Sequence, residues 1–387
     1  MSRLLVVAST FPARAGDGTP GFVRDLAQYE ARHFDTLVLV PRTPGAPARE
    51  RVSDSLTIEW FPYFPRRWEA LAHGAMVENM RKSKGMLAQV PFFLGAELAA
   101  IRKAVRRFRP DVIHAHWVVP QGAAVLMAAR GVPFVLTTLG GDLYALNGAL
   151  PTRLKRAVVE KASSLTTMNT DMRERLLALG ADPERTHVVP MGADLDALRK
   201  TGEGVERVPG RMLFAGRLVE KKGGAVLLEA LRSLPSGWSL DVVGDGPLRA
   251  DLERAAAGMP VRFLGQLSRV ELAKAMYAAE VVVVPSVPAA SGDQDGLPVV
   301  LLEAMGAGSA IVASRLAGID EAVVDGESGL LVPPGDVAAL RDALAGLLAD
   351  PGRRAALGAA AAERAESFSV EAIGERYVAL LNDALRR

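Results

Sequence analysis

The stretch DGLPVVLLEAMGAG, Asp295–Gly308, decides the fold because it combines a turn, a helix start and a helix end. Pro298 suits the first position of a helix, where its missing amide costs no hydrogen bond. Gly308 is the expected terminator, because glycine accepts the backbone conformation that ends many helices. The amides around residues 297–300 then lack intrahelical partners and favour an anion such as a diphosphate. The stretch therefore predicts a helix that begins beside an anionic ligand.

Two acidic residues accompany this predicted helix. Glu303 lies about a turn and a half inside it, where a carboxylate can accept two hydroxyl hydrogen bonds from a ribose. Asp295 lies just before the helix and can reach hydroxyl groups nearer the far end of the anion. The alternative is an acid that stabilises the helix dipole and a solvated glutamate. These residues alone do not separate the two interpretations.

Basic and glycine-containing turns upstream favour the ligand interpretation. In FAGRLVEKKGG, residues 214–224, Arg217 follows a predicted strand, and Lys222 comes five residues later, before a glycine and a helix. Two cations at the carboxyl end of a strand suit a diphosphate. VVGDGP at 242–247 and FLGQLS at 263–268 are further strand-to-turn segments at the same edge. Each signal is weak singly, but together they indicate a nucleotide site.

Predicted strands alternate with helical patterns along the whole chain. Most strands are near-continuous apolar runs, as in buried parallel sheets, and the alternation is typical of α/β folds with helices on both faces. Helices are expected between the strands, for example at 223–233, 249–257 and 270–279. The predicted strands are 4–9, 36–40, 56–61, 111–116, 134–139, 164–169 and 187–192, then 211–216, 239–244, 261–265, 281–286, 310–314 and 329–333.

This pattern divides the chain into two domains. We predict an N-terminal domain at 1–195, a polar linker at 196–210, and a C-terminal domain at 211–369. An amphipathic helix at 370–387 is expected to pack back on the first domain. Open α/β sheets bind ligands at the carboxyl ends of their strands, so a cleft between two such edges is expected.

Composition excludes several classes of protein. The net charge of +2 argues against nucleic acid as a partner, and the lack of cysteine excludes disulfides and thiolate metal sites. Five histidines, His33, His73, His114, His116 and His187, disfavour a histidine-built metal site. No apolar run is long enough to span a bilayer, and no signal-peptide pattern is visible. A cytoplasmic protein is expected.

The loop GDGTPG, residues 16–21, has the G-x-G-x-x-G spelling of dinucleotide-binding loops. It comes too late after the first strand, and Pro20 removes an amide that a pyrophosphate would need. The next strand ends in Pro41 and Arg42, with no acid for a ribose. A nicotinamide or flavin enzyme is therefore disfavoured. A plain turn before a helix at 22–32 and an anion-contacting loop of another α/β enzyme both stay open.

A basic and aromatic segment, residues 60–109, interrupts the alternation. One interpretation is a helical excursion packed on the first domain. The other is a surface that contacts an anionic membrane or grips an acceptor, because aromatic and basic side chains suit that boundary. The segment contains Phe61, Tyr63, Phe64, Phe92 and Phe93, with the basic pairs Arg66 and Arg67, Lys82 and Lys84, and Arg106 and Arg107.

With these motifs the chain resembles the retaining glycosyltransferases of family 4. The resemblance covers nearly the whole chain, is strongest over 211–334, and extends to STFPARAGDGTPGFVRDLA at 9–27, DVIHAHW at 111–117 and TTLGGD at 137–142. It implies the GT-B fold, in which two Rossmann-like domains with parallel sheets face each other across a cleft. It also implies transfer of a hexose from a nucleoside-diphosphate sugar to a glycan, lipid-linked or small-molecule hydroxyl acceptor. A UDP-linked donor is favoured and a GDP-linked donor is possible.

The resemblance assigns roles in the second domain. Arg217 and Lys222 would stabilise the departing diphosphate, and Asp295 would serve the donor sugar as a shorter variant of the family's usual glutamate. Glu303 would bind the ribose, and the backbone near Leu267 would meet the nucleobase. The backbone that would line the sugar and phosphate belongs to Gly296, Leu297, Pro298 and Val299.

In the first domain the resemblance places Gly18 beside the donor phosphate, so that GDGTPG would serve a sugar nucleotide. Leu139 occupies the position where many relatives carry a histidine that touches the sugar, whereas Asp142 keeps its place. His114 and His116 alternate along a strand and so share one side. A packed strand end and an acceptor-site role both stay open for them.

The resemblance further implies front-face attack with retention, no metal and no cofactor besides the donor. Peripheral contact with the inner face of the membrane is a further expectation. Two alternatives share the architecture: a sugar-nucleotide epimerase, and a nucleotide-sugar-binding homologue with impaired catalysis, for which Leu139 is the hint.

Overall fold

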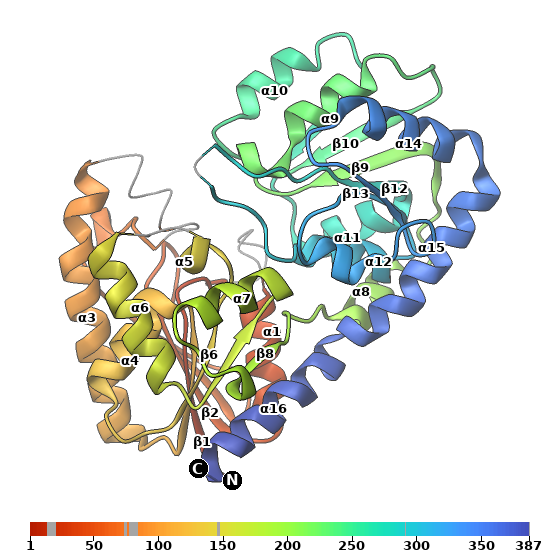
Figure 1. Cartoon of the computed structure of the whole chain (residues 1–387). Coiled ribbons are helices and arrows are strands. Elements are labelled where there is room, and N and C mark those ends of the chain that lie inside the picture. The colour runs from red at the N-terminus through yellow and green to blue at the C-terminus, as the bar shows by residue number, and fades with distance from the viewer. Residues whose placement is uncertain (14–20, 73–75, 77–83, 145–147, 291, 387) are drawn as a thin grey trace. The chain divides into compact units, whose positions relative to one another are not determined.

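The computed structural model describes residues 1–13, 21–72, 76, 84–144, 148–290 and 292–386 (Figure 1). The chain forms two compact units. The first unit is Met1–Met191 with Ile373–Arg387, and the second is Gly192–Ala372. Each unit contains one largely parallel sheet with helices on its faces, as the α/β prediction requires.

The first unit contains an eight-stranded sheet in the order β3-β4-β2-β1-β5-β6-β7-β8. All neighbours pair in parallel except the edge strand β3, which pairs antiparallel with β4. The seven strands predicted for this half are confirmed, whereas β3 was missed because RER is short and has no apolar pattern. The strands are β1 (Arg3–Val7), β2 (Asp35–Pro41), β3 (Arg49–Arg51), β4 (Leu56–Phe61), β5 (Val112–His116), β6 (Phe134–Thr137), β7 (Ser164–Thr167) and β8 (Thr186–Val188).

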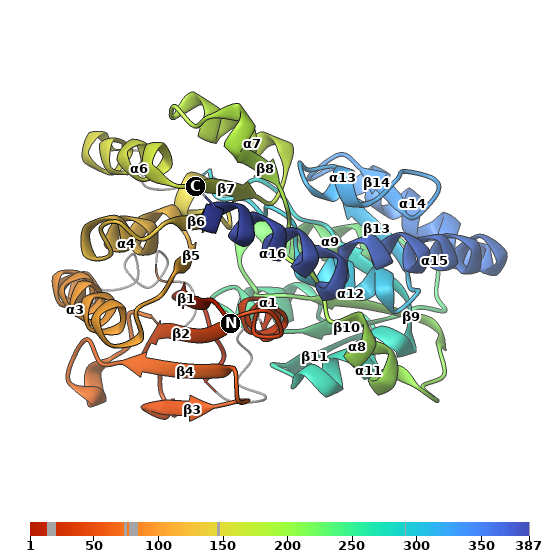
Figure 2. The same ribbon diagram turned by 90° about the horizontal axis from the view of Figure 1, so that it is seen from below.

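Helices cover both faces of this sheet. Helices α3, α4 and α6 lie on one face, and α1 and the C-terminal helix α16 lie on the other (Figures 1 and 2). The helices of the first unit are α1 (Phe22–Glu30), α3 (Lys84–Phe108), α4 (Ala123–Ala128), α5 (Gly141–Tyr144), α6 (Ala149–Lys161), α7 (Thr170–Ala178) and α16 (Val370–Arg386).

Helix α16 contacts the first unit through a buried tyrosine and a glycine. Tyr377 is fully buried, and its hydroxyl donates a hydrogen bond of 2.9 Å to the carbonyl of Val189. The same hydroxyl lies 3.3 Å from that of Thr166 on β7. At Gly374 a side chain would collide with the ring of Tyr29 on α1. These contacts explain why residues from the chain's end belong to its first unit.

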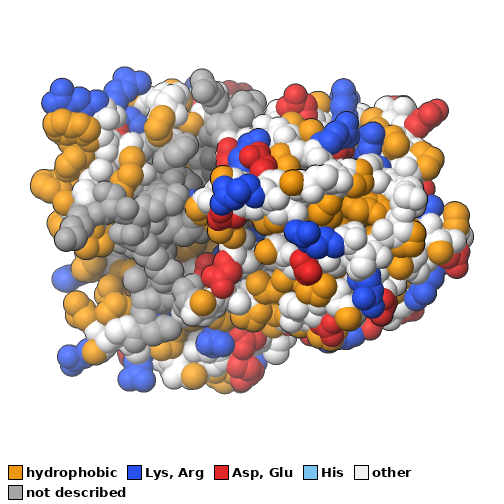
Figure 3. All heavy atoms as spheres, turned by 90° about the horizontal axis from the view of Figure 1, so that it is seen from above, with side chains coloured by type: hydrophobic (Ala, Val, Ile, Leu, Met, Phe, Trp, Pro, Cys, Tyr) orange, Lys and Arg blue, Asp and Glu red, His pale blue; other side chains and the backbone are white. Residues whose placement is uncertain are grey.

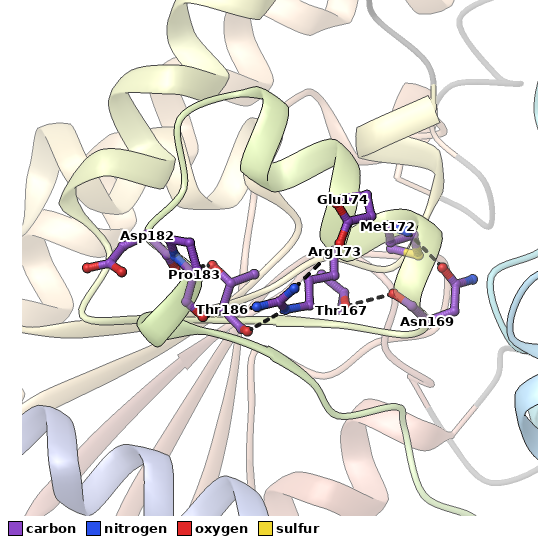
Figure 4. A network of polar contacts seen from close by, with 8 residues as sticks. All are labelled: Thr167, Asn169, Met172, Arg173, Glu174, Asp182, Pro183 and Thr186. Carbon is purple, nitrogen blue, oxygen red and sulfur yellow. Dashed lines mark hydrogen bonds and ion pairs between the residues drawn. The ribbon is translucent and has the colours of Figure 1, made fainter.

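A polar network fixes the crossover from β7 through α7 to β8 (Figure 4). The side chain of Asn169 caps α7 by accepting a 2.8 Å hydrogen bond from the amide of Met172. The Thr167 hydroxyl donates to the carbonyl of Asn169 at 3.0 Å. In α7, the guanidinium of Arg173 donates to the carbonyl of Thr186, at the start of β8, at 3.0 Å. The helix is therefore held both at its start and to the next strand.

The second unit contains a six-stranded parallel sheet in the order β11-β10-β9-β12-β13-β14. All six predicted strands are confirmed. They are β9 (Val208–Ala215), β10 (Ser239–Val243), β11 (Val261–Gly265), β12 (Ala279–Val284), β13 (Ala310–Ser314) and β14 (Leu330–Val332).

Two apolar cores lie on the two faces of this sheet. Helices α8, α11, α12 and α15 supply one core, and α9, α10 and α14 supply the other. The helices are α8 (Leu195–Gly202), α9 (Gly224–Leu231), α10 (Arg249–Ala255), α11 (Arg269–Ala278), α12 (Val299–Gly306), α13 (Ile319–Ala322), α14 (Val337–Ala349) and α15 (Pro351–Ala365).

The predicted linker at 196–210 requires a correction. Helix α8 occupies Leu195–Gly202, and β9 already begins at Val208. The carboxylate of Asp194 caps α8 by accepting a 3.0 Å hydrogen bond from the amide of Ala197. Leu195 and Leu198 are buried in the core of the second unit. Because only these two leucines form the apolar face, the surrounding polar residues hid the helix.

Close packing of α15 beside the end of α12 gives a test of the second unit. At Gly358 a Cβ atom would lie 2.2 Å from the carbonyl oxygen of Gly308. We expect Gly358→Ala to lower the free energy of unfolding by about 1–3 kcal/mol, because the two backbones must separate. The matched control is Gly346→Ala in α14, where a Cβ meets no atom within 4 Å. This control should raise the free energy of unfolding by about 0.5–1 kcal/mol. Calorimetry of the two variants compares the shifts, and equal shifts would contradict the packing argument.

Candidate functional site

The strand order of the second unit locates its candidate site. The chain leaves β9 toward β10 on one side and leaves β12 toward β13 on the other. Ligands of open α/β sheets bind at such a reversal, outside the carboxyl ends of the strands. The turn after β9 (216–223) and the turn after β12 (285–290 and 292–298) begin at this point. The predicted cations and the predicted acid Asp295 lie on these two turns.

An ion pair between a half-buried lysine and a buried aspartate joins the two turns. The ammonium of Lys222, in the short helical turn η4 (Glu220–Lys222), lies 2.8 Å from Oδ2 of Asp295. The hydroxyl of Ser286 donates to the same oxygen at 2.8 Å. Burial by itself raises the pKa of Asp295, but Lys222, Lys221 and these hydrogen bonds outweigh it, so the pKa is below its ordinary value. Asp295 is therefore an ionised carboxylate with a fixed orientation.

A second lysine and a second aspartate complete the cluster. Lys221 Nζ lies 3.0 Å from Oδ2 of Asp293 and 3.8 Å from Oδ1 of Asp295. The amide of Val287 also donates to the carbonyl of Lys221 at 2.8 Å. Two lysines thus meet two aspartates, and the backbone adds a direct link between the turns. Sequence reasoning missed Lys221, Asp293 and Ser286, although the doublets EKK and DQD were a visible signal.

Two glycines let the backbones at this edge approach each other. Gly223 has φ +69°, and a Cβ there would lie 1.8 Å from the carbonyl oxygen of Pro285. Gly244 has φ +123°, and a Cβ there would lie 1.9 Å from the carbonyl oxygen of Gly216. The glycine turn predicted at 242–247 therefore packs against the turn after β9. Both glycines serve the close contact between turns.

Helix α12 begins directly after the ion pair. Pro298 is its cap residue, not its first helical residue as predicted, because its ψ of 122° is extended. No side chain of the described residues caps the helix, and the first amides of a helix have no intrahelical acceptor. Gly308 follows with φ +67°, as predicted for the terminator. The start of α12, with Gly296 and Pro298 buried beside it, has the character of an anion site.

The remaining predicted residues of this unit lie along the same edge or helix. Arg217 is half-buried directly after β9, and Leu267 is half-buried just before α11. Leu267 packs on the same core as Leu297 and Val299. Glu303 is half-buried in α12 and lines a cavity of about 120 Å³, together with Asp194, Ala197, Thr201, Arg269 and Leu272. The structure thus brings Lys222 and Asp295 together, whereas Glu303 faces a cavity shared with residues of α8 and α11.

The first unit has its own strand reversal between β1 and β5. Gly18, predicted in the turn after β1, lies outside the described residues. His114 and His116 lie on β5, and Leu139 and Asp142 follow β6. His116, Leu139 and Asp142 lie at or just after the carboxyl ends of two adjacent parallel strands, and His114 lies in the middle of β5.

His114 is engaged by buried partners on both sides. Its Nδ1 lies 2.6 Å from Oε1 of Glu30, and its Nε2 lies 2.7 Å from the hydroxyl of Thr137. Burial raises the pKa of Glu30 well above its ordinary value and lowers the pKa of His114 to about 3. Both shifts disfavour charge on these two side chains, which lie within hydrogen-bonding distance of each other. The Thr137 hydroxyl lies 2.7 Å from the hydroxyl of Thr166, which in turn lies 3.3 Å from the hydroxyl of Tyr377. The series of hydrogen bonds therefore extends from Glu30 to α16. These contacts favour the packed-strand interpretation for His114.

His116 differs from His114. It is fully buried, and neither of its ring nitrogens has a hydrogen-bond partner among the described residues. Burial and the neighbouring His114 hold the pKa of His116 well below its ordinary value, so the ring is neutral. The next residue, Trp117, has φ +76°, an unusual conformation for a residue other than glycine. The acceptor-side interpretation therefore stays open for His116.

Asp142 positions the turns around this point. Its Oδ2 accepts a 2.7 Å hydrogen bond from the amide of Val118, in the turn after β5. Its Oδ1 accepts from the amides of Leu139 at 3.3 Å and Gly140 at 3.2 Å. The buried carboxylate therefore connects the turn that carries Leu139 to the turn that follows His116.

A second buried acid holds the same turn from α3. Gln121 Nε2, in the turn η2 (Val118–Gly122), donates to Oε1 of Glu97 at 2.9 Å. Both side chains are buried, and burial raises the pKa of Glu97 to about 8. Glu97 is therefore largely protonated at neutral pH. Sequence reasoning missed this pair, since nothing local marks a glutamate in a helix as buried.

The raised pKa of Glu97 makes a pH prediction for stability. The folded state binds this proton more tightly than the unfolded chain, whose glutamate has an ordinary pKa of 4.5. The contribution of Glu97 is complete below pH 4.5 and is lost as pH rises toward 8. Glu97→Gln keeps an amide partner for Gln121 and removes the titration. We expect its melting temperature to fall less than that of the wild type over this interval.

The matched control for this experiment is Glu160→Gln, an exposed acid on α6 of the same unit. Its melting curve should follow the wild type at every pH. If Glu97→Gln also follows the wild type, Glu97 does not titrate as described.

Among the residues that the structure describes, no group of three or more acidic or histidine side chains is placed to hold a metal ion. None of the described helices combines the length and apolar character that crossing a bilayer requires.

Comparison with protein families assigns both halves of the chain. Residues 209–350 match the model described as "Glycosyl transferases group 1", and residues 18–192 match "Glycosyl transferase 4-like domain". A D-inositol 3-phosphate glycosyltransferase from Frankia alni is 35% identical over 319 residues, which cover 72% of this chain and 76% of the relative. An amylovoran biosynthesis glycosyltransferase from Erwinia amylovora is 34% identical over 175 residues, which cover 43% of each chain. The match thus spans less than half of the Erwinia relative.

Solved structures show the same fold. A sucrose-phosphate synthase from Thermosynechococcus elongatus has a TM-score of 0.79 at 22% identity, covering 99% of this chain and 98% of its own. An Anabaena protein solved with UDP and glucose has a TM-score of 0.71 at 20% identity, covering 99% of this chain and 100% of its own. Identity at this level establishes the GT-B architecture alone.

Proposed function

This chain belongs to the glycosyl transferase group 1 family, and we propose that it is a retaining hexosyltransferase that uses a nucleoside-diphosphate sugar. The observation that carries the proposal is the partly buried Lys222–Asp295 pair at the start of α12. A cation, an oriented carboxylate and a helix start with unpaired amides meet at the strand reversal of one sheet. This combination suits a ligand that is a diphosphate at one end and a sugar at the other.

In the proposed complex, Arg217, Lys222 and the start of α12 bind the diphosphate. The ammonium of Lys222 has three N–H donors, so its bond to Asp295 leaves donors for phosphate oxygens. Asp295 is held by Lys222 and Ser286, and its carboxylate accepts hydrogen bonds from the donor sugar. Glu303, with its adjoining cavity, binds the ribose hydroxyls.

The proposed reaction breaks the bond between the anomeric carbon and the diphosphate oxygen, which takes the electron pair. The acceptor hydroxyl attacks the same face, and its proton passes to the departing phosphate, so the configuration is retained. Negative charge grows on the diphosphate during this step, and fixed cations stabilise it. Arg217 and Lys222 supply this charge, so we propose that no divalent cation is required. Turnover should then be unchanged by a metal chelator.

We propose a UDP-linked hexose as the donor, with a GDP-linked hexose as the alternative. The Anabaena structure with UDP and glucose supports the first choice by its fold. The names of the Frankia and Erwinia relatives support a small-molecule or glycan hydroxyl as acceptor, and a lipid-linked hydroxyl is the third possibility.

A thermal-shift panel of UDP, GDP and ADP sugars tests the donor. A ligand at 100 times its dissociation constant adds about 2.7 kcal/mol of stability. Slow release of nucleoside diphosphate without acceptor distinguishes a transferase from an impaired homologue, which releases none. Conversion of the donor into an isomeric sugar nucleotide would instead identify an epimerase.

The charge argument predicts different kinetic roles for Lys222 and Glu303. Lys222→Ala should lower kcat by about 10² or more, because Lys222 faces charge that grows in the transition state. It should change nucleotide affinity by no more than about tenfold, or roughly 1.4 kcal/mol. Glu303→Gln should weaken nucleotide binding with a modest loss of kcat, because the ribose does not change during reaction.

Lys221→Ala is the matched control for Lys222. It removes a neighbouring lysine whose ammonium lies 3.8 Å from Asp295, compared with 2.8 Å for Lys222. Its kcat should stay within about tenfold of the wild type, because the shorter contact remains. Titration calorimetry and steady-state kinetics measure all three variants. The assignment of roles is wrong if Lys222→Ala loses only affinity, or if Glu303→Gln loses only kcat.

A further inference from the structure

Trp117 has a backbone conformation that tryptophan rarely adopts. It directly follows β5 and has φ +76° and ψ 134°. Among the described residues, Arg109 at φ 52° is the other residue besides glycine with a positive φ. Such a conformation strains a bulky residue and persists only where neighbouring contacts enforce it. Strained residues of this kind collect at functional sites, so Trp117 is a candidate for a role in the reaction.

Hydrogen bonds on both sides fix the backbone of Trp117. Its amide donates to the carbonyl of Thr137, at the end of β6, at 2.7 Å. Its carbonyl accepts a 3.0 Å hydrogen bond from the amide of Gly122, in the turn η2. The next amide, that of Val118, donates to Oδ2 of Asp142 in α5 at 2.7 Å. Three segments of the first unit therefore hold one strained residue in place.

A buried lysine supports the aspartate in this arrangement. Lys155 in α6 is 2% exposed, and its ammonium lies 3.4 Å from the carbonyl oxygen of Leu143. Burial lowers the pKa of Lys155, and the charge of Asp142 opposes that shift. Burial likewise raises the pKa of Asp142, and its backbone hydrogen bonds and Lys155 oppose the rise. Buried charges of opposite sign add little net stability, so they indicate a turn whose position matters.

The side chain of Trp117 lies where a ligand of this sheet would bind. Trp117 follows β5, and β5 with β1 forms the strand reversal of the first unit. The indole is half-buried, whereas Trp60 of the same unit is 3% exposed and belongs to the core. Its ring is T-shaped to that of His116, with 6.4 Å between the centroids. A half-buried indole at this point offers part of its surface to a bound molecule.

The two turns beside the indole contain little charge. Residues 117–120 and 138–142 include one charged residue, Asp142, which is buried and binds backbone amides. Val119, Pro120 and Leu139 are half-buried and apolar. Figure 3 views the first unit from the side on which its parallel strands end, and the basic side chains visible there lie toward the rim of the unit. These turns therefore suit an uncharged molecule with an apolar face.

We propose that Trp117 selects the acceptor by stacking its indole on an uncharged pyranose ring. A pyranose with equatorial hydroxyls presents C–H groups on both faces and carries its hydroxyls around the rim. One C–H face packs on the indole, which supplies a large and rigid apolar surface. A rim hydroxyl is then left to attack the anomeric carbon of the donor. This role rests on the transfer reaction proposed above and narrows its acceptor to sugar rings.

Saturation-transfer NMR with the full chain tests the stacking without any donor. The ring probe is methyl β-D-glucopyranoside, and the open-chain probe is D-glucitol, which carries similar hydroxyls but no ring. We expect the wild type to saturate the C–H protons of the glucoside and to leave glucitol nearly unsaturated. Trp117→Ala should lower the glucoside signal at least about fivefold. Trp117→Phe keeps an aromatic face and should retain most of the signal.

The matched control is Phe108→Ala, which removes a half-buried aromatic residue at the end of α3. Because α3 ends just before β5 begins, Phe108 lies at the opposite edge of the sheet from Trp117. This variant should give the wild-type signal. Equal signals from glucitol and the glucoside, no glucoside signal, or a glucoside signal that Trp117→Ala leaves unchanged would each overturn the role of Trp117.

Melting temperatures test the strain at Trp117 apart from any ligand. Trp117→Ala and Trp117→Gly remove the same indole, but only glycine adopts the positive φ without strain. We expect Trp117→Gly to melt about 2–10 °C above Trp117→Ala. At Arg102, an exposed residue of α3, the glycine variant should melt below the alanine variant, because glycine is the poorer helix former. If glycine melts below alanine at Trp117 as well, that residue is not strained and the proposal is overturned.

Donor hydrolysis by the wild type separates this role from the proposed function. Release of nucleoside diphosphate without any glucoside signal supports the proposed function and overturns the role of Trp117. A glucoside signal that depends on Trp117, without any release, supports the sugar contact and contradicts the proposed function. Both results together support a transferase whose acceptor is a sugar ring stacked on Trp117.

Discussion

The Lys222–Asp295 pair is the interaction on which the candidate site depends. A carboxylate that is 9% exposed is costly unless a cation and hydrogen bonds compensate its lost hydration. Lys222 and Ser286 provide that compensation, but only if the turns after β9 and β12 touch. The turns touch because β9 and β12 are neighbours in the sheet and because Gly223 allows its backbone to approach Pro285. The close contact between these two turns is therefore required both by the fold of the second unit and by the candidate site.

The first unit handles buried polar groups differently. Glu30 and Glu97 have raised pKa values, and among the described residues neither is paired with a lysine or an arginine. One hydrogen bond engages Oε1 of each glutamate, while Oε2 of each is buried without a partner among the described residues, so loss of the charge takes the part that Lys222 plays for Asp295. Asp295 and these two glutamates thus meet the same desolvation cost in opposite ways, and the first unit also contains a buried carboxylate paired with a cation, Glu69 with Arg42.

The sequence predicted the architecture well because buried parallel strands leave long apolar runs. The exposed strand β3 and the polar helix α8 carried no such signal. Arg217, Lys222 and Asp295 could be proposed because each lies at a recognisable strand end or helix start, and Glu303 because it follows such a helix start at a fixed spacing. Ser286 and Glu97 could not, since their roles depend on partners that the fold brings from other segments. The two histidines of β5 show the same limit, because identical residues two positions apart have different partners.

The buried contacts of Tyr377 have a consequence for how the protein is made. The first unit needs residues from the end of the chain, so the ribosome must synthesise the whole second unit before the first can be completed. Until then the sheet face that α16 covers stays open, with the hydroxyl of Thr166 on it, while the second unit is contiguous in sequence and free to fold. Domains usually fold in the order in which they emerge. Here the unit that emerges first is finished last, which leaves its apolar face available to chaperones during translation.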